Sequence, residues 1–134
     1  VIVPSNTEEK EKEMSKKKKI LVVDDDKIIV KLVKEILEEE GFEVDTATDG
    51  LKGFEKIKKN TYDVIVSNQD MPRMKGHELY MEVKKLSLDL SKRILFISGN
   101  ITDFIKSTGN RFLSKPFSHK QLKAAVREII ASKE

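Results

Sequence analysis

The 134-residue chain is long enough for one domain with its own hydrophobic core and too short for two. It contains 38% hydrophobic and 37% charged residues but no cysteine, which excludes a disulfide framework, a thiolate zinc site and a cysteine nucleophile. No apolar run approaches the roughly 18 to 20 residues that a membrane-spanning helix needs, and no signal peptide is evident. We therefore expect a cytoplasmic protein that makes no direct contact with a membrane.

The net charge of +3 at pH 7 does not indicate a nucleic-acid binder. Residues 1–19 contain six Lys and four Glu, a net charge of +2, which leaves residues 20–134 at +1. A nearly neutral domain lacks the excess of cations that binds a phosphate backbone, so we expect no direct contact with nucleic acid. We interpret the lysine run at 16–19 as a solvated lead-in to the first strand.

Residues 1–17 are predicted to be a charged linker or arm, because "SNTEEKEKEMSKKKK" shows no apolar periodicity. The chain starts at Val1 instead of Met, which leaves two origins open. Either Met14 is a natural start preceded by foreign residues, or residues 1–13 are the tail of a preceding domain. Residues 18–134 are predicted to form one domain.

From Lys18 onward, short apolar runs alternate with helical patterns. The predicted strands are 19–23, 42–48, 62–66, 93–98 and a segment within 111–117. Apolar residues at helical spacing mark the predicted helices: Ile29, Leu32, Val33, Ile36 and Leu37 before a stop at Gly41; Leu51, Phe54 and Ile57 on one face; Leu79, Val83 and Leu86; and Leu122, Val126, Ile129 and Ile130 after a cap at Ser118. This alternation predicts an α/β fold, a doubly wound five-stranded parallel sheet with helices on both faces. Apolar and polar residues alternate most clearly in the second strand, which favours a position at the edge of the sheet.

Polar side chains follow four of the predicted strands at the point where each ends. They are Asp24, Asp25 and Asp26 after the first strand, Asn68 after the third, Ser98 at the end of the fourth and Lys115 after the fifth. Because functional groups gather outside the carboxyl ends of such strands, we expect these side chains to lie together. Clustered carboxylates favour Mg2+, and a lysine and a hydroxyl can hold phosphoryl oxygens. A carboxylate at position 68 could attack phosphorus and form an acyl phosphate.

The motifs at these strand ends resemble those of the receiver domain of two-component response regulators. "ILVVDDD", "SNQDMPRMKG", "FISG" and "LSKPF" occur in the family's order and span nearly all of residues 18–134. The resemblance implies a flavodoxin-like, receiver-type fold and a signalling switch instead of a stand-alone enzyme. It also implies a histidine kinase or phosphotransfer domain as the partner.

The resemblance assigns roles to individual positions. Asp24 and Asp25 match the acidic pair that holds Mg2+, with Asp25 as the direct ligand, and Asp70 matches the residue whose backbone carbonyl binds the metal. Asn68 matches the aspartate that accepts the phosphoryl group. Ser98 and Lys115 match the hydroxyl and the lysine that engage that group, Phe112 matches the rotating aromatic switch, and the Lys115–Pro116 bond matches one that is usually cis.

Asn68 departs from the family pattern, because an amide stands where the phosphoacceptor aspartate belongs. An amide oxygen carries no full charge and is a poor nucleophile, so we expect this chain to stay unphosphorylated and to bind Mg2+ more weakly. Two explanations stay open: an engineered substitution, or a natural pseudo-receiver that acts as a phosphorylation-independent interaction module.

The fourth helix is expected to be short, because only 16 residues lie between Ser98 and Lys115. "NITDFIKSTGN" allows about two helical turns. The face that this helix forms is where family members often dimerise, so the oligomeric state stays open. The short helix and the wording "TGNRFLSKPF" resemble receivers appended to hybrid sensor kinases, and the charged arm fits such an attachment.

Plainer structural roles remain possible for several of these residues. Asp24–Asp26 could be a solvated turn and helix cap, and Phe112 could belong to the core. We expect His77 and His119 to be exposed helix residues and not ligands, because no histidine pair has metal spacing. The methionines at 71, 74 and 81 are expected to pack and not to bind a cofactor.

Two other functions fit the same architecture less well. A flavin carrier would need a phosphate-binding loop after the first strand, where Asp24–Asp26 would repel the phosphate. A phosphatase that uses an aspartate nucleophile would carry that aspartate after the first strand and would need a larger cap. The sequence therefore favours the receiver.

Overall fold

The computed structural model describes residues 17–133, so the predicted arm, apart from Lys17, lies outside the described residues. The strands are β1 (Lys19–Val23), β2 (Glu43–Ala47), β3 (Val64–Ser67), β4 (Ile94–Ser98) and β5 (Phe112–Ser114). The helices are α2 (Lys27–Glu39), α3 (Gly50–Lys59), α4 (Gly76–Leu86), α5 (Leu88–Ser91), α6 (Asp103–Ser107) and α7 (His119–Lys133). Each predicted strand and helix is present.

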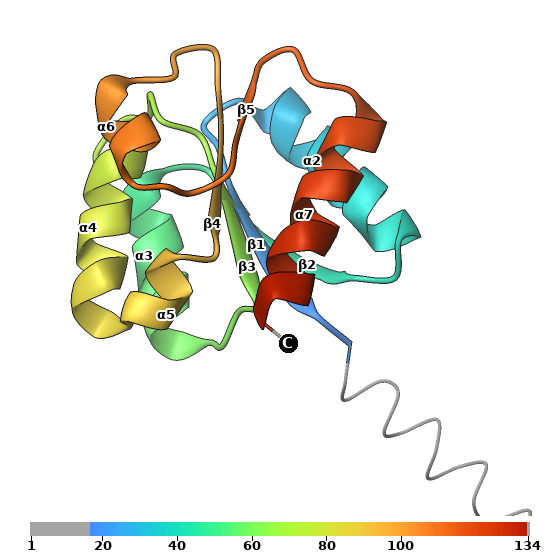
Figure 1. Cartoon of the computed structure of the whole chain (residues 1–134), viewed down its shortest axis with the longest axis horizontal. Coiled ribbons are helices and arrows are strands. Elements are labelled where there is room, and N and C mark those ends of the chain that lie inside the picture. The colour runs from blue at the N-terminus through green and yellow to red at the C-terminus, as the bar shows by residue number, and fades with distance from the viewer. Residues whose placement is uncertain (1–16, 134) are drawn as a thin grey trace, which may run out of the picture.

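The five strands form one parallel sheet in the order β2-β1-β3-β4-β5, which confirms the predicted doubly wound α/β architecture. The second strand lies at an edge, as its alternating pattern predicts. Helices α2 and α7 cover one face, and α3, α4 and α6 cover the other (Figure 1). Because all strands run the same way, the loops that follow them share one edge of the sheet, at the top of Figure 1.

Each face of the sheet packs its own hydrophobic core. Alternate residues of the central strands point to opposite faces, so Ile20 and Val22 meet α2 and α7, whereas Leu21 and Val23 meet the helices of the other face. These four side chains are fully buried. The central strands are therefore held on both sides, and the loops at their ends start from fixed positions.

Side-chain caps set the start of several helices. Asp26 accepts hydrogen bonds from the backbone N–H groups of Ile28 and Ile29 at the start of α2. Ser118 accepts one from Gln121 ahead of α7, which confirms the predicted cap. After α2 the chain turns at Gly41, whose φ of +92° suits glycine, and this confirms the predicted stop.

Some details differ from the predictions. Three leucines expected on the inner faces of helices are exposed in part: Leu32 by 37%, Leu51 by 39% and Leu86 by 55%. Each sits at the margin of an apolar stripe, where the spacing alone does not separate core from rim. The sequence also gave no sign of α5. The predicted short fourth helix is confirmed, because α6 has five residues.

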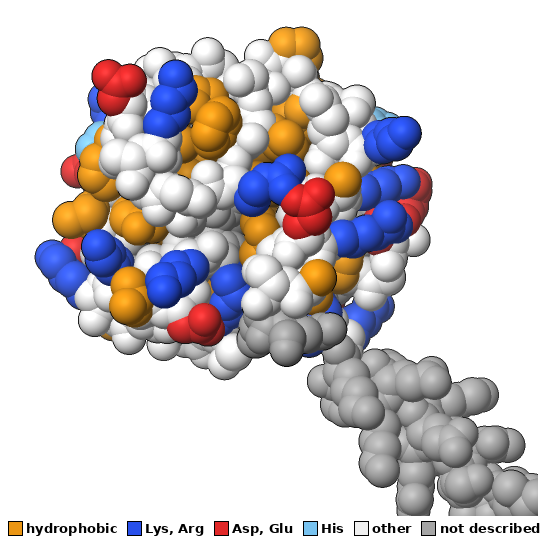
Figure 2. All heavy atoms as spheres, in the orientation of Figure 1, with side chains coloured by type: hydrophobic (Ala, Val, Ile, Leu, Met, Phe, Trp, Pro, Cys, Tyr) orange, Lys and Arg blue, Asp and Glu red, His pale blue; other side chains and the backbone are white. Residues whose placement is uncertain are grey.

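Charged side chains of both signs share the surface. Figure 2 shows Lys and Arg spread over the visible face with acidic residues among them, and no single basic stripe on that face. Between residues 17 and 133, no helix combines the length and apolar character needed to cross a bilayer.

Candidate functional site

The strand ends bring the predicted site residues to one edge of the sheet. Asp24 follows β1, Asn68 follows β3, Ser98 ends β4 and Lys115 follows β5. Backbone hydrogen bonds continue the sheet past the strands: the Asn68 N–H donates to Val23 O at 2.9 Å, and the Lys115 N–H donates to Ser98 O at 2.8 Å. The site residues therefore extend directly from a rigid sheet.

The acid–lysine pair lies at the centre of this edge. Lys115 Nζ donates to Asp24 Oδ2 at 2.7 Å, and the backbone N–H of Asp26 donates to Asp24 Oδ1 at 3.0 Å. The Asp24 side chain is fully buried, and that of Lys115 is 22% exposed. Asp24 is therefore no solvated turn residue. Asp26, in contrast, has the alternative structural role of a helix cap, at the start of α2.

The pKa of Asp24 is raised above its ordinary value of 3.8, because burial disfavours the charged carboxylate. The hydrogen bond from Lys115 and the one from the Asp26 backbone oppose this effect, and so does the charge of Lys115. The carboxylate of Asp24 thus depends on Lys115 as its counter-charge.

Asn68 lies beside this pair and is 6% exposed. Its side-chain nitrogen Nδ2 donates to Asp25 Oδ1 at 3.3 Å and to the backbone carbonyl oxygen of Asp70 at 3.1 Å. These partners determine the orientation of the amide. Both are oxygen acceptors, and only the NH2 end of the Asn68 side chain can donate hydrogen bonds to them. Asn68 therefore connects the acidic loop after β1 to the loop after β3.

Ser98 and Phe112 occupy the β4–β5 side of the site. Ser98 is 1% exposed, and its Oγ accepts a hydrogen bond from the Asn100 backbone N–H at 3.1 Å. Phe112 is 38% exposed, which excludes the alternative that it is a plain core residue. The Lys115–Pro116 peptide bond is cis, as the resemblance implies.

The loop between β3 and α4 is fixed by contacts that the sequence did not reveal. Gln69 is 3% exposed, and its Oε1 accepts a hydrogen bond from the His77 backbone N–H at 2.8 Å. The other end of the same amide, Nε2, lies 2.6 Å from His77 Nδ1. The prediction of an exposed His77 is therefore wrong: its ring is partly buried against Gln69 and lies 5.6 Å from the Phe104 ring, centroid to centroid. His119 is exposed as predicted.

Two backbone features shape the same loop. A Cβ atom added at Gly76 would lie 2.4 Å from the Asn68 carbonyl oxygen, so only glycine permits this approach. Arg73 has φ of +68°, a left-handed conformation that costs energy for a residue with a side chain. The loop that carries Asn68 and Asp70 is thus tightly constrained.

A family model for the "Response regulator receiver domain" matches residues 20–127. That span contains every site residue described above. The chain belongs to this receiver family. Receiver domains of response regulators interact with histidine kinases.

Similar proteins support the assignment. A probable transcriptional regulator, ycf29 of Porphyra purpurea, is 31% identical over 108 residues, which cover 77% of this chain and 52% of that protein. The chain spans about half the length of the curated relatives it matches. A CheY-like receiver domain protein from Methanospirillum hungatei is 28% identical with a TM-score of 0.81, and the match covers 87% of this chain and 96% of that one.

A third relative was solved with ligands. The response regulator TrrA from Thermotoga maritima, in complex with Mg(2+)-BeF, is 32% identical with a TM-score of 0.77. The match covers 84% of this chain and 98% of that one.

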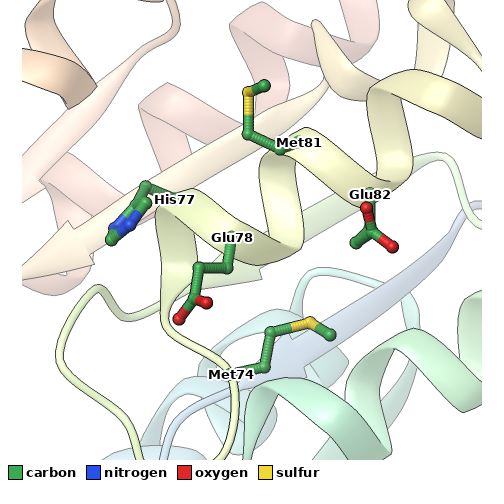
Figure 3. Close-up of a pocket in the computed structure, with 5 residues that line it drawn as sticks. All are labelled: Met74, His77, Glu78, Met81 and Glu82. Carbon is green, nitrogen blue, oxygen red and sulfur yellow. The ribbon is translucent and has the colours of Figure 1, made fainter.

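Among the hollows on the surface of this receiver domain, two lie close to the residues described above. One, of about 370 Å3, is lined by Met74, His77, Glu78, Met81 and Glu82 around α4. In Figure 3, Met74 and Met81 lie on opposite sides of the α4 ribbon, so these side chains do not converge on one point. The carboxylates are also engaged, since Glu78 accepts a bond from the Lys75 N–H and Glu82 pairs with Lys85. Met71 is buried and Met74 packs against the core, as predicted, but Met81 is 45% exposed, so the packing prediction is wrong for Met81.

The second hollow, of about 320 Å3, adjoins the acid–lysine pair. It is lined by Ile29, Leu32, Lys115, Pro116 and Phe117, between α2 and the start of α7. Leu32, which the spacing placed in the core, instead forms part of this groove. The groove therefore connects an apolar surface with the polar site.

Proposed function

We propose that this receiver domain is a phosphorelay switch whose phosphoacceptor position is occupied by Asn68, so that the chain remains unphosphorylated. The observation that carries the proposal is the placement of the Asn68 amide at the end of β3, between Asp25 and Asp70 and next to the Asp24–Lys115 pair. Asp24, Ser98 and Lys115, which match other positions of a receiver site, lie at the same edge of the sheet.

The chemistry explains why one atom matters. In phosphotransfer from a phosphohistidine, a carboxylate oxygen attacks phosphorus while the P–N bond breaks, and the histidine nitrogen keeps the electron pair. Lys115 Nζ and Ser98 Oγ are the groups that would hold the transferred oxygens. The neutral oxygen of the Asn68 amide lacks the charge that drives the attack. The chain acts as a switch and not as a stand-alone enzyme in this proposal.

The residues present do not form a good Mg2+ site in this conformation. The position between Asp25 Oδ1 and the Asp70 carbonyl faces the Asn68 nitrogen, which cannot be a ligand while it carries two protons. Asp24 is engaged with Lys115. Within residues 17–133, no group of three His, Cys, Asp or Glu side chains is arranged to hold a metal ion. We therefore propose that Mg2+ binds this chain only weakly.

We propose a histidine kinase or a phosphotransfer domain as the partner, with the groove beside Lys115 as its contact. Ile28 is 78% exposed and Leu32 is 37% exposed, so α2 offers apolar side chains next to the site. A partner that brings a histidine to the site has to dock beside it, and this apolar groove shares Lys115 with the site.

The test compares this chain with Asn68→Asp in the presence of Mg2+ and beryllofluoride, the ligands in the TrrA complex. We expect two-dimensional NMR of Asn68→Asp to show shifts at Ser98 and Phe112, and the parent chain to show none. Shifts in the parent would contradict the proposal. No response in either protein would favour a phosphorylation-independent interaction module instead.

A further inference from the structure

We propose that the Asn68 amide takes the place of a divalent cation in this pocket, so that the folded site needs no metal. The inference rests on the proposed function, because it concerns the same site, and it adds how that site is held together. A cation in an acidic pocket draws several oxygen atoms to one point. Here the Asn68 side-chain nitrogen, which carries two protons, draws two oxygen atoms toward itself.

The geometry supports this substitution. Nδ2 has two protons to donate, and it has two acceptors: a carboxylate oxygen of Asp25 at 3.3 Å and a backbone carbonyl of Asp70 at 3.1 Å. Asp25 comes from the loop after β1, and Asp70 from the loop after β3. The amide therefore links two loops through their oxygen atoms, as a bound cation would.

The charges point the same way. Lys115 and the Asp26 N–H compensate the buried carboxylate of Asp24. A carboxylate at position 68 would add a further negative charge beside Asp25 and would have no proton to offer either oxygen. The repulsion between the two acids would then require a cation. The neutral amide removes that charge and supplies the donors in one group.

The experiment measures the thermal unfolding of three proteins in EDTA and in millimolar Mg2+ at matched ionic strength. They are the parent chain, Asn68→Asp and Asn68→Leu, which keeps the branched shape of the side chain without its donors. For the parent, we expect Mg2+ to change Tm by less than about 1 °C. For Asn68→Asp, we expect a Tm roughly 3 to 6 °C lower in EDTA and recovered by Mg2+ in a saturable manner. For Asn68→Leu, we expect a lower Tm that Mg2+ does not recover.

Two results would overturn the inference. One is a rise in Tm of the parent with Mg2+ as large as that of Asn68→Asp. The other is an Asn68→Leu variant as stable as the parent, because the bridge would then contribute nothing. If a variant does not fold, NMR of the parent decides: the Asn68 NH2 signals should exchange slowly with water and should not move with Mg2+, and movement would contradict the inference.

The inference and the proposed function fail in different ways. If Asn68→Asp binds Mg2+ but does not respond to beryllofluoride, the proposed function fails while the amide bridge stands. If Asn68→Asp responds and the parent is also stabilised by Mg2+, the bridge and the weak Mg2+ binding fail, while the switch role proposed for this domain stands.

Discussion

The two ends of the sheet differ in how their charged side chains are paired. At the amino ends of the strands, opposite charges lie together and satisfy one another. At the carboxyl ends, Asp24, Asp25, Asp26 and Asp70 follow β1 and β3, and of these four acids only Asp24 pairs with Lys115. The first arrangement adds stability, whereas the second keeps an excess of negative charge that can do chemistry.

At the amino end, side chains from neighbouring strands contact one another. Tyr62 Oη donates to Asp45 Oδ2 at 2.7 Å, and Lys19 Nζ lies 3.5 Å from the same oxygen. Arg93 Nη1 donates to the backbone carbonyls of Tyr62 and Asp63, at 3.1 Å and 2.7 Å. Tyr62 is 1% exposed. These contacts fasten β2 and the starts of β1, β3 and β4 together.

The pKa values reflect the difference. Burial raises the pKa of Asp24, and Lys115 offsets it only in part. Burial also acts to raise the pKa of Asp45, but the Tyr62 hydrogen bond and the charges of Lys19 and Lys56 outweigh it, so that the pKa falls below 3.8. An acid that folding makes harder to ionise marks the functional end, and an acid made easier to ionise marks the structural end.

The largest effect is expected for Lys115→Met. It leaves Asp24 buried without its counter-charge, and we expect a loss of about 3 kcal/mol in the free energy of unfolding at pH 7.5. The pKa of Asp24 would rise further, so Asp24 would keep its proton in the folded state at pH values where it has lost it in the unfolded state, whose pKa is 3.8. The free energy of unfolding would then fall as the pH rises from 3.8 to the raised pKa of Asp24 in the folded state. Urea unfolding at pH 5 and pH 7.5 measures this, and a deficit no larger at pH 7.5 would contradict it.

The next effect concerns the loop that carries Asn68. Gly76→Ala would place a Cβ atom 2.4 Å from the Asn68 carbonyl oxygen. We expect a loss of about 2 kcal/mol, because a backbone atom must move. Gly99→Ala is the matched control, since nothing lies within 4 Å of a Cβ added there. Equal stability of the two variants, measured by urea unfolding, would show that the close approach is not limiting.

A smaller effect is expected at the amino end. Tyr62→Phe removes the hydroxyl that Asp45 accepts from, at a cost of about 1 to 2 kcal/mol. The contribution of Asp45 is present above pH 3.8 and is lost as pH falls through its lowered folded pKa, so the cost should shrink in acid. In Asn68→Asp, the added Tyr62→Phe change should leave phosphorylation unaltered. An altered phosphorylation yield would mean that the two ends are not separate.

The smallest effect should be a gain. Arg73→Gly relieves a left-handed residue, worth about 1 to 2 kcal/mol, and adds about 0.5 to 1 kcal/mol of chain entropy cost. The ion pair with Asp49 is long, at 3.9 Å, and Arg73 is 63% exposed, so its loss should matter little. A net gain of about 0.5 kcal/mol is expected from urea unfolding, and a loss would contradict the strain at Arg73.

The sequence predicted the sheet and most of the site because these depend on local patterns. Apolar runs and helical spacing define the strands and helices, and the parallel topology then places Asp24, Asn68, Ser98 and Lys115 at one edge. The contacts that hold the site were not predictable. The Gln69–His77 contact and the Asn68 bridge depend on how two loops meet, and no spacing in the sequence records that meeting.

The exposed leucines show that the sequence also could not predict which helix residues are covered by a neighbouring element. Leu32 fits the apolar spacing of α2 but lies in the groove next to Lys115. Periodicity assigns a residue to a helix face, but the neighbouring helix decides whether that face is covered. The amino-end network was also missed, because Tyr62, Asp45 and Arg93 carry no motif.

In this proposal, Asn68 alone separates this chain from a working phosphoacceptor. The most direct measurement is intact mass after incubation with acetyl phosphate and Mg2+, for this chain and Asn68→Asp side by side. We expect one added phosphoryl group on Asn68→Asp and none on the parent. Asn68→Asp that gains no phosphoryl group, or a parent that gains one, would contradict it.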